Sequence, residues 1–564
     1  MSEKNNHLNR SWRRVSGVGV RRFARQLLPA GVAAAVVIAI IQSALLISSA
    51  GASHGGTTVL VDGGDSTSDA GGCGDVANPC DTIQAAVDHA APGDTISIAA
   101  GTYVEQVEID KALTLDGGNK EVVIIESPDT LTEKFTTAAD NYPIVFVHDT
   151  DGVTIRDLTV DGVGKGNANF RFIGIGYSDA SGTVEGVRVT GVRETPINGN
   201  QHGVGIFAFA ASGTPRTIAV TNSQVDDYQK SVLVLAGANL TATVKGNTVV
   251  GAGPTEFIEQ SGIQAGFGAG GSITGNEISL HDFIPGTLAA TAILIFEAAP
   301  GMDVLTNDVH DNMEGVLIHS SDDVTVGSNT VADIEGVAVF AFLSDGGTYA
   351  ANSLTNSAIG LWNADSSNVA ITGNIIDANN HGLIIDGAST NVQVFGNEIT
   401  NNTANSSGIH VQAFESASPS NIGAHFNLIA GNGASGGYGV FNDTTNDVNA
   451  TNNWWGAVDG PSGVAPGSGD PVTEHVVYDP WLLSAAAAGD TDSDGCRDEQ
   501  ESGPDEKFGG RRDPQYYYDF MDMWVNKQKD RRVNIIDIAA LVQRFGTAGD
   551  ASGDPLDPPQ ALTG

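Results

Sequence analysis

The chain has 564 residues, and its 67 aspartates and glutamates outnumber its 27 lysines and arginines, which gives a formal net charge of −40. Nucleic acids and anionic lipid surfaces repel so acidic a chain, and neither is an expected partner. The 71 glycines and only 17% charged residues favour many short strands joined by tight turns over a bundle of helices. The composition therefore predicts an all-β protein.

The N-terminal segment has the order of an export signal. Several arginines precede an apolar run at residues 31–47, and the small residues Ala50-Gly51-Ala52 follow it. We expect cleavage after Ala52. Because the run is longer than a typical signal core, an uncleaved membrane anchor is the alternative, and it would be the only contact with a membrane. Residues 1–52 are thus predicted to be a signal peptide or anchor, and the rest to be extracellular or on the cell surface.

Three cysteines are too few to form the framework of a chain of this length. Cys73 and Cys80 are close enough in sequence for one local disulfide in an exported protein, and Cys496 is left over. The fold must therefore rest on packing and hydrogen bonds.

From about residue 220, an alternating apolar strand runs repeatedly into a turn built on asparagine, as in VKGNTV, ITGNEI and VFGNEI. Asparagine tolerates the left-handed conformation of a sharp corner, and stacked copies can bond amide to amide from coil to coil. The shortest spacings are 22 or 23 residues, which predicts a solenoid of short coils lengthened in places by loops. The turn asparagines are Asn222, Asn247, Asn276, Asn307, Asn329, Asn352, Asn374, Asn397, Asn427 and Asn453.

A second phrase of five residues recurs on each coil, as in Gly315-Val-Leu-Ile-His319. Its second and fourth positions are aliphatic in every copy, which predicts a strand face that points into a continuous core. The fifth position faces outward, and stacked coils would align its members in one column about 4.8 Å apart. These members are Phe207, Leu235, Phe296, His319, Phe340, Trp362, Asp386 and Gln412.

These repeats resemble those of the pectin-lyase-like superfamily of right-handed parallel β-helices, and of periplasmic NosD-type proteins. Residues 82–90 are similar to the helix that caps the first coil in that superfamily, and NNWWGAVDGPSG at 452–463 is similar to its closing coil. The resemblance covers residues 59–483. It implies an all-β, right-handed parallel β-helix solenoid over residues 53–483, with an N-terminal capping helix. It implies no particular activity, because one fold hosts many functions.

The aromatic members of the outward column predict a platform on which neutral sugar rings stack: Phe207, Phe296, Phe340 and Trp362. The resembling superfamily often keeps its binding groove on such a face. The alternative is a hydrophobic stripe covered by inserted loops. Acid–base candidates near the column are His319, Asp322, Asp323, His381, Asp386 and His410. No polygalacturonase motif is complete around them, so whether the chain is an enzyme stays open.

No lysine or arginine occurs between Lys245 and Arg497. Lyases that act on acidic polysaccharides need cations for the uronate carboxylates and commonly an arginine or lysine base. A pectate-lyase-like enzyme would therefore have to use the cations of the N-terminal coils, Arg156, Lys165, Arg171 and Arg188. We expect instead an extracellular polysaccharide that is neutral or bridged by calcium.

Beyond a linker at 484–489, residues 490–501 place oxygen ligands at calcium-loop positions 1, 3, 5, 7, 9 and 12, with Gly495 at position 6. The expected Ca²⁺ ligands are Asp490, Asp492, Asp494, Cys496 through its backbone carbonyl, Asp498 and Glu501. The loop resembles EF-hand-like loops of thrombospondin type 3 repeats and dockerins. Residues 502–564 resemble a degenerate dockerin, in which lysines and arginines crowd the loop at 526–537 and count against calcium there. A cohesin partner is the corresponding hypothesis.

Two main hypotheses follow. The first is a secreted or surface β-helix protein that binds an extracellular polysaccharide through its outer strand face, and that would be a lyase or glycoside hydrolase if it also processes it. The second is a non-catalytic structural or adhesive surface protein. A NosD-like role in metal insertion is disfavoured because methionine and cysteine are few.

Overall fold

The computed structural model describes residues 57–64, 72–284, 289–402, 407–432 and 436–485. These residues form one short helix, α2 (Ile83–His89), a 3-10 turn, η1 (Lys165–Asn167), and strands that run from β1 (Thr58–Val61) to β45 (Val476–Val477). The export segment, the calcium loop, the dockerin-like segment and Cys496 lie outside the described residues. Nearly all of the regular structure is therefore β, as predicted.

The strands form three parallel sheets of 16, 13 and 16 strands, and each turn of the chain visits all three. One coil shows the order: β24 (Asp303–Leu305) in the first sheet, β25 (Asp308–His310) in the second and β26 (Glu314–His319) in the third. The chain then returns to the first sheet as β27 (Thr325–Gly327). We name the turn between the first and second sheets the first corner, the next the second corner, and the return the third corner.

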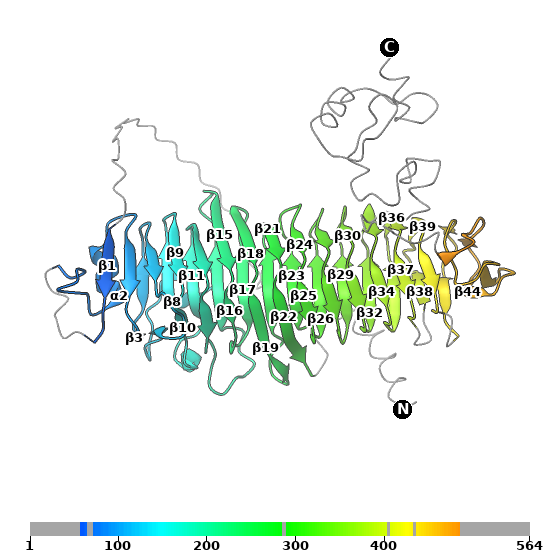
Figure 1. Cartoon of the computed structure of the whole chain (residues 1–564). Coiled ribbons are helices and arrows are strands. Elements are labelled where there is room, and N and C mark those ends of the chain that lie inside the picture. The colour runs from blue at the N-terminus through cyan, green and yellow to red at the C-terminus, as the bar shows by residue number, and fades with distance from the viewer. Residues whose placement is uncertain (1–56, 65–71, 285–288, 403–406, 433–435, 486–564) are drawn as a thin grey trace, which may run out of the picture. The chain divides into compact units, whose positions relative to one another are not determined.

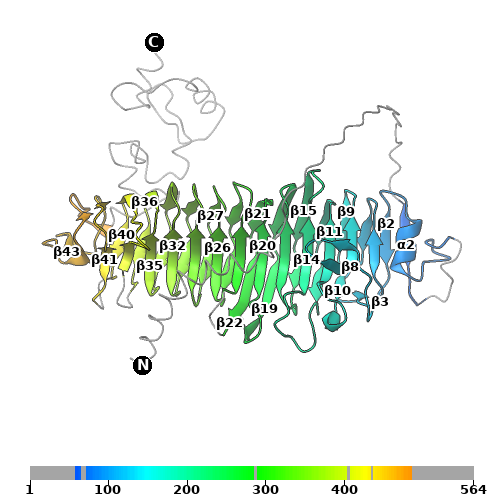
Figure 2. The same ribbon diagram turned by 180° about the vertical axis from the view of Figure 1, so that it is seen from behind.

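Two compact units divide the chain, and each is described by itself. The N-terminal unit comprises Met1–Leu235, Asn247–Ile263 and Leu280–Thr291, and the C-terminal unit comprises Ala236–Gly246, Gln264–Ser279 and Ala292–Gly564. Within each unit the strands of successive coils lie side by side (Figures 1 and 2). In the N-terminal unit the third sheet contains β4 (Val107–Ile109), β8 (Asp140–His148), β11 (Phe172–Ser178) and β14 (Val204–Phe209). In the C-terminal unit it contains β26, β29 (Val337–Phe342), β32 (Ile359–Ala364), β35 (His381–Asp386), β38 (Ser407–Gln412) and β41 (Tyr438–Asn442).

The first coil of the N-terminal unit is capped as its sequence predicts. Thr82 is the N-cap of α2, and its side chain accepts from the backbone nitrogen of Ala85 at 3.2 Å. The helix buries Ile83, Ala86 and Val87, so its apolar face closes the end of the core. A disulfide joins Cys73 and Cys80, which confirms the local bridge.

Aliphatic side chains of the third sheet fill the core of the C-terminal unit. Val316 pairs with Val339 of the next coil, and Val339 pairs with Leu361. All three are at most 1% exposed, which confirms the inward face of the repeated phrase at these positions. It does not hold at Val337 and Ile359, the second positions of their copies, which belong to an outward row described below. Each such side chain contributes roughly 1.5–3 kcal/mol of hydrophobic stabilisation relative to leaving it in water.

Asparagine side chains form a ladder inside the first corner of the C-terminal unit. Asn352 Oδ1 accepts from the backbone nitrogen and from Nδ2 of Asn329, at 3.0 and 2.9 Å. Its own Nδ2 donates to Asn374 Oδ1 at 2.9 Å. The predicted stacking of amides is confirmed, and the same side-chain bond recurs along Asn276, Asn307, Asn329, Asn352, Asn374, Asn397, Asn427 and Asn453.

The left-handed residue of this corner is the one before each ladder asparagine, such as Ser328 with a φ of 54°. The prediction that the asparagines adopt this conformation was therefore wrong for the ladder positions. Asn222 does have a positive φ of 50°, but Ser223 takes the ladder position beside it and donates from its backbone nitrogen to Asn247 Oδ1 at 2.9 Å. The left-handed residue makes the turn, and the side chain after it points inward.

The other two corners of the C-terminal unit carry ladders of their own. In the second corner, backbone and side-chain amides are joined along Ser357, Asn379, Asn402, Asn432 and Asp470. In the third corner, serine hydroxyls accept from backbone nitrogens along Ser321, Ser344, Ser366 and Ser389.

Trp455 is fully buried in the last coils, as expected for a residue that closes the core. No helix within the described ranges is both long and apolar enough to cross a membrane.

Candidate functional site

The outward side chains of the third sheet in the C-terminal unit form three rows, and together we name them the outer face. The middle row follows the strand pairing through Leu317, Phe340, Trp362, Ile384, His410 and Phe441. The end row follows it through His319, Phe342, Ala364, Asp386 and Gln412. The start row, at the beginning of the strands, contains Val337, Ile359 and His381.

The prediction of one outward column was wrong, because its members are divided between two of these rows. His319 pairs with Phe342, so Phe340 lies two residues away from the place expected for it. Trp362 pairs with Ile384 rather than with Asp386. A shift of two residues keeps every side chain on the same face of a strand, so the alternating sequence pattern is unchanged by it.

Aromatic rings contact one another along the middle and end rows. The ring centroids of Phe340 and Trp362 are 4.8 Å apart, with 22° between the ring planes. The His319 ring lies between Phe296 and Phe342, at 5.2 and 5.1 Å. These side chains are largely buried, since Phe296, Phe340 and Trp362 are 3, 6 and 7% exposed.

Several polar atoms among these rings are buried without a hydrogen-bond partner in the part of the chain that the structure describes. They are both ring nitrogens of His319, Nε1 of Trp362 and Nδ1 of His381. An unpaired buried polar group costs about 1–3 kcal/mol. Burial lowers the pKa of His319, and burial together with the nearby charge of His410 lowers the pKa of His381 to about 4. Both imidazoles are therefore neutral at pH 7.

Two of the predicted acid–base residues, His381 and His410, come close together on β35 and β38, whereas Asp386 lies at the other end of β35 from His381. The rings of His381 and His410 are 6.4 Å apart and nearly parallel. His410 Nε2 lies 3.7 Å from Asp443 Oδ2, and Gln412 Nε2 donates to Asp386 Oδ2 at 3.3 Å. The outer face thus combines neutral imidazoles and a carboxylate with an apolar surface.

Asp322 and Asp323 do not join this group, because they lie in the third corner after β26. Asp322 Oδ1 accepts from the backbone nitrogen of Asp345 at 2.9 Å, and Asp345 accepts in the same way from Ser367 at 2.7 Å. Asp323 has a φ of 56°, which marks it as a turn residue. The structure gives Asp322 a contact that stabilises successive turns.

Glu314 is a residue of the outer face that the sequence analysis missed. It opens β26, is 8% exposed, and its Oε2 accepts from the backbone nitrogen of Val337 at 2.8 Å. Burial raises the pKa of its carboxyl to about 8. The absence of lysine and arginine from this part of the sequence indicates that any carboxyl buried here lacks such a partner, but it does not identify Glu314 as that carboxyl.

In the N-terminal unit, Phe207 belongs to a stripe that is covered. Gly176 pairs with Phe146 on one side and with Phe207 on the other, and so leaves a gap between the two rings. Phe135 of β7 (Phe135–Thr136), which pairs antiparallel with β8, fills this gap at 5.2 Å from Phe146 and 5.9 Å from Phe207. For Phe207 the structure therefore favours the covered stripe over a sugar platform.

The four cations that a lyase would need are engaged in the N-terminal unit. Arg156 pairs with Asp116 at 2.5 Å, and Arg188 pairs with Asp226 at 3.0 Å. Lys165 donates to the backbone oxygen of Ser127 at 2.7 Å, and Arg171 donates to the Thr137 hydroxyl at 3.0 Å. These contacts give the pectate-lyase alternative no support.

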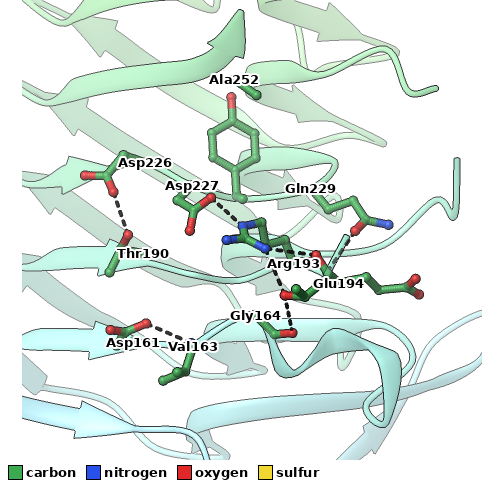
Figure 3. A network of polar contacts seen from close by, with 12 residues as sticks. Asp161, Val163, Gly164, Thr190, Arg193, Glu194, Asp226, Asp227, Gln229 and Ala252 are labelled. Atoms are coloured by element: carbon green, nitrogen blue, oxygen red, sulfur yellow. Dashed lines mark hydrogen bonds and ion pairs between the residues drawn. The ribbon is translucent and has the colours of Figure 1, made fainter. Parts of the chain in front are cut away.

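A polar network fixes the long second-corner loop at 191–203 of the same unit (Figure 3). Arg193 donates to Asp227 Oδ1 at 2.5 Å and to the backbone oxygen of Glu194 at 3.1 Å. The buried Glu194 carboxylate accepts from Asn198, Asn200 and His202. Burial acts to raise the pKa of Glu194, but these hydrogen bonds outweigh it and lower the pKa overall. We interpret the network as a structural anchor for the loop.

The three parallel sheets, the corner ladders and the inward aliphatic rows define a right-handed parallel β-helix. Residues 204–374 and 291–454 match the model of the family described as "Right handed beta helix region". The curated protein YwoF of Bacillus subtilis, itself uncharacterized, is 26% identical over 133 residues. That match covers 22% of this chain and 27% of YwoF, so the chain spans about a quarter of the length of this relative.

Similar solved structures include three β-helix proteins. The lacto-N-biosidase of Eubacterium ramulus is 10% identical, with 58% of this chain and 64% of that chain covered and a TM-score of 0.39. The periplasmic alginate epimerase AlgG is 13% identical, with 63 and 75% covered and a TM-score of 0.35. The A-module of the mannuronan C-5 epimerase AlgE6 of Azotobacter vinelandii is 17% identical, with 71 and 94% covered and a TM-score of 0.34. Likeness at this level carries no information on activity.

Proposed function

We propose that the C-terminal unit binds an extracellular polysaccharide along its outer face. The observation that carries the proposal is the set of buried, unpartnered nitrogens of His319, Trp362 and His381 among aromatic rings in contact with one another. A sugar ring presents C–H groups on its faces and hydroxyls on its edge, so it can stack on the rings and pair these nitrogens at the same time.

Charge favours a neutral ligand or one whose carboxylates are bridged by calcium. Between Lys245 and Arg497 the sequence offers no cation that could pair with a uronate carboxylate. Asp386 and Asp443 also lie at the outer face and would repel such a ligand. We therefore expect uncharged chains to bind without calcium, and acidic chains to bind only when it is present.

A binding and cleavage assay on the full-length protein tests the proposal. Galactomannan and xyloglucan serve as neutral probes and polygalacturonate as the acidic one, each with and without Ca²⁺, and new reducing ends report cleavage. Trp362→Ala should weaken binding of a neutral probe about tenfold, which corresponds to about 1.4 kcal/mol. Phe395→Ala is the matched control, because Phe395 ends β36 of the first sheet and its ring forms a tilted pair with that of Phe426 at 5.3 Å. An equal loss in both variants, or no binding at all, would contradict the proposal.

A second candidate is a structural or adhesive surface protein without catalysis. The low exposure of Phe296, Phe340 and Trp362 favours it, since a sugar must reach the rings that it stacks on. Quenching of Trp362 fluorescence by acrylamide separates the two candidates. Strong quenching that a neutral glycan suppresses supports binding, whereas a tryptophan that stays unquenched supports the structural role.

We also infer that the protein is exported and that its tail binds calcium. Export is supported by the arginine-rich and apolar order of residues 1–52 and by the disulfide between Cys73 and Cys80, since disulfides persist in oxidising compartments. Calcium is supported by the ligand spacing of residues 490–501 alone. Calorimetric titration of the protein with Ca²⁺ tests the second point, and Asp494→Ala should remove the binding.

A further inference from the structure

Glu314 is held in a way that is unusual for a carboxyl on the outside of a sheet. Its Oε2 accepts from the backbone nitrogen of Val337 at 2.8 Å. Gly336 makes the space, because a Cβ added there would lie 2.5 Å from Glu314 Oε1. The carboxyl is therefore positioned by one backbone donor and by the missing side chain of the next coil.

The described residues from 292 to 485 contain neither lysine nor arginine to keep this carboxyl ionised. His310, whose pKa is raised by its hydrogen bond to Asp311, is held by that aspartate at 2.8 Å. The titratable side chains of the two second-corner turns beside Glu314 are acidic: Asp311, Asp333 and Glu335. Burial, opposed only by the Val337 hydrogen bond, raises the pKa of Glu314 to about 8. The group is thus a neutral acid at pH 7.

The position of Glu314 in the strand places it on the outer face. A Cβ added at the next residue, Gly315, would lie 2.9 Å from Val331 Cγ1 in the core, so Gly315 faces inward. Strict alternation is interrupted after Gly315, because Val316 also points into the core. The side of the row that contains Glu314 is instead shown by its member His381, whose ring lies 6.4 Å from the outward ring of His410. The partner of Glu314, Val337, continues through Ile359 to His381, which makes Glu314 a member of the start row.

We propose that Glu314 donates a hydrogen bond from its neutral carboxyl to the bound polysaccharide, so that binding depends on this one proton. The proposal rests on the glycan-binding function proposed above. A protonated carboxyl has an O–H donor that a carboxylate lacks, and a sugar oxygen is a suitable acceptor. A carboxyl of the same type in water would have lost its proton at pH 7 and could only accept.

The experiment follows the affinity of the full-length protein for galactomannan and xyloglucan from pH 5 to pH 9. The wild-type affinity should stay level to about pH 7 and fall about tenfold by pH 9, as the proton is lost one unit above the pKa. Glu314→Gln, which keeps an N–H donor, should bind at all pH values without this fall. Glu314→Ala should bind more weakly than either at pH 6, again without a fall. Glu335→Gln, in the next coil, is the control and should follow the wild type.

The results separate a failure of the role of Glu314 from a failure of the glycan-binding proposal. A wild-type affinity that stays level to pH 9, or a fall that persists in Glu314→Gln, would overturn the role of Glu314 and leave glycan binding intact. Failure of both glycans to bind at any pH would remove both proposals together. If Glu314→Gln does not fold, the comparison of the wild type with Glu335→Gln still shows whether a group that titrates near pH 8 controls binding.

Discussion

Replacing one asparagine of the first-corner ladder with alanine should destabilise the C-terminal unit by about 3 kcal/mol or more. Asn352 is the choice, because it is 1% exposed and lies in the middle of the ladder. Its side chain accepts two hydrogen bonds from Asn329 and donates one to Val326 O at 2.8 Å and one to Asn374 Oδ1. Asn352→Ala leaves the two donors of Asn329 and the Val326 carbonyl without these partners, and each unpaired buried group costs about 1–3 kcal/mol.

The loss should be local at first. Coils of a solenoid contact only their neighbours, so the coils next to Asn352 should open before distant ones. Urea unfolding, followed by circular dichroism, gives the total change in free energy. Amide hydrogen exchange, read for the strands on either side of residue 352, shows where protection is lost.

Asn449→Ala is the matched control, since Asn449 is an exposed asparagine of the same unit whose side chain accepts from the Thr451 hydroxyl at 3.2 Å. Its replacement should change the stability by less than about 0.5 kcal/mol. If Asn352→Ala costs no more than Asn449→Ala, the ladder does not stabilise the fold. A loss of protection spread evenly over all coils would instead contradict the local character of the effect.

Three further predictions concern other parts of the chain. Because the pKa of Glu314 is raised from 4.5 to about 8, the folded state keeps the proton of this carboxyl between these two pH values, whereas the unfolded state has lost it. The stability of the wild type should therefore fall with rising pH relative to Glu314→Gln, by up to about 1.4 kcal/mol per pH unit in urea unfolding. The pKa of His381 is lowered to about 4, so its contribution is present above pH 6.5 and is lost as the pH falls to 4, and His381→Gln should reduce the acid sensitivity over that range. Phe135→Ala should cost roughly 2 kcal/mol in thermal unfolding by uncovering Phe146 and Phe207, whereas the exposed Thr136→Ala should have little effect.

The sequence was sufficient for the coil and for its core because both depend on patterns that repeat. The spacing of the asparagines reflects the length of one coil, and the alternation of apolar residues reflects which side chains point inward. Neither pattern distinguishes between two pairings of neighbouring strands that differ by a shift of two residues, because such a shift keeps every side chain on the same face. For this reason Val316 and Val339 were correctly assigned to the core, while the outward alignment of His319 with Phe340 was wrong.

Corner chemistry was predicted in kind but not in position. The sequence showed that asparagine amides would stack, yet the residue that turns the chain is the one before, where serine, threonine, glycine, alanine and phenylalanine all occur. The last position of a ladder needs only an acceptor, which explains why Asp470 ends the second-corner ladder. There it accepts from the backbone nitrogen and from Nδ2 of Asn432, at 2.8 and 2.9 Å. A search for asparagine alone cannot find that end.

The acidic character of the C-terminal unit has two consequences at the outer face, and only one of them could be seen in the sequence. Without lysine or arginine the face has no cation for a uronate ligand, which follows from composition alone. For the same reason a carboxyl that the fold buries has no cation either, and it can remain in place only as a neutral acid. Which carboxyl this is depends on Gly336, whose missing side chain admits Glu314, and on the Val337 nitrogen that holds it. Composition therefore fixed the charge state that such a group must have, and the packing of two neighbouring coils selected the residue.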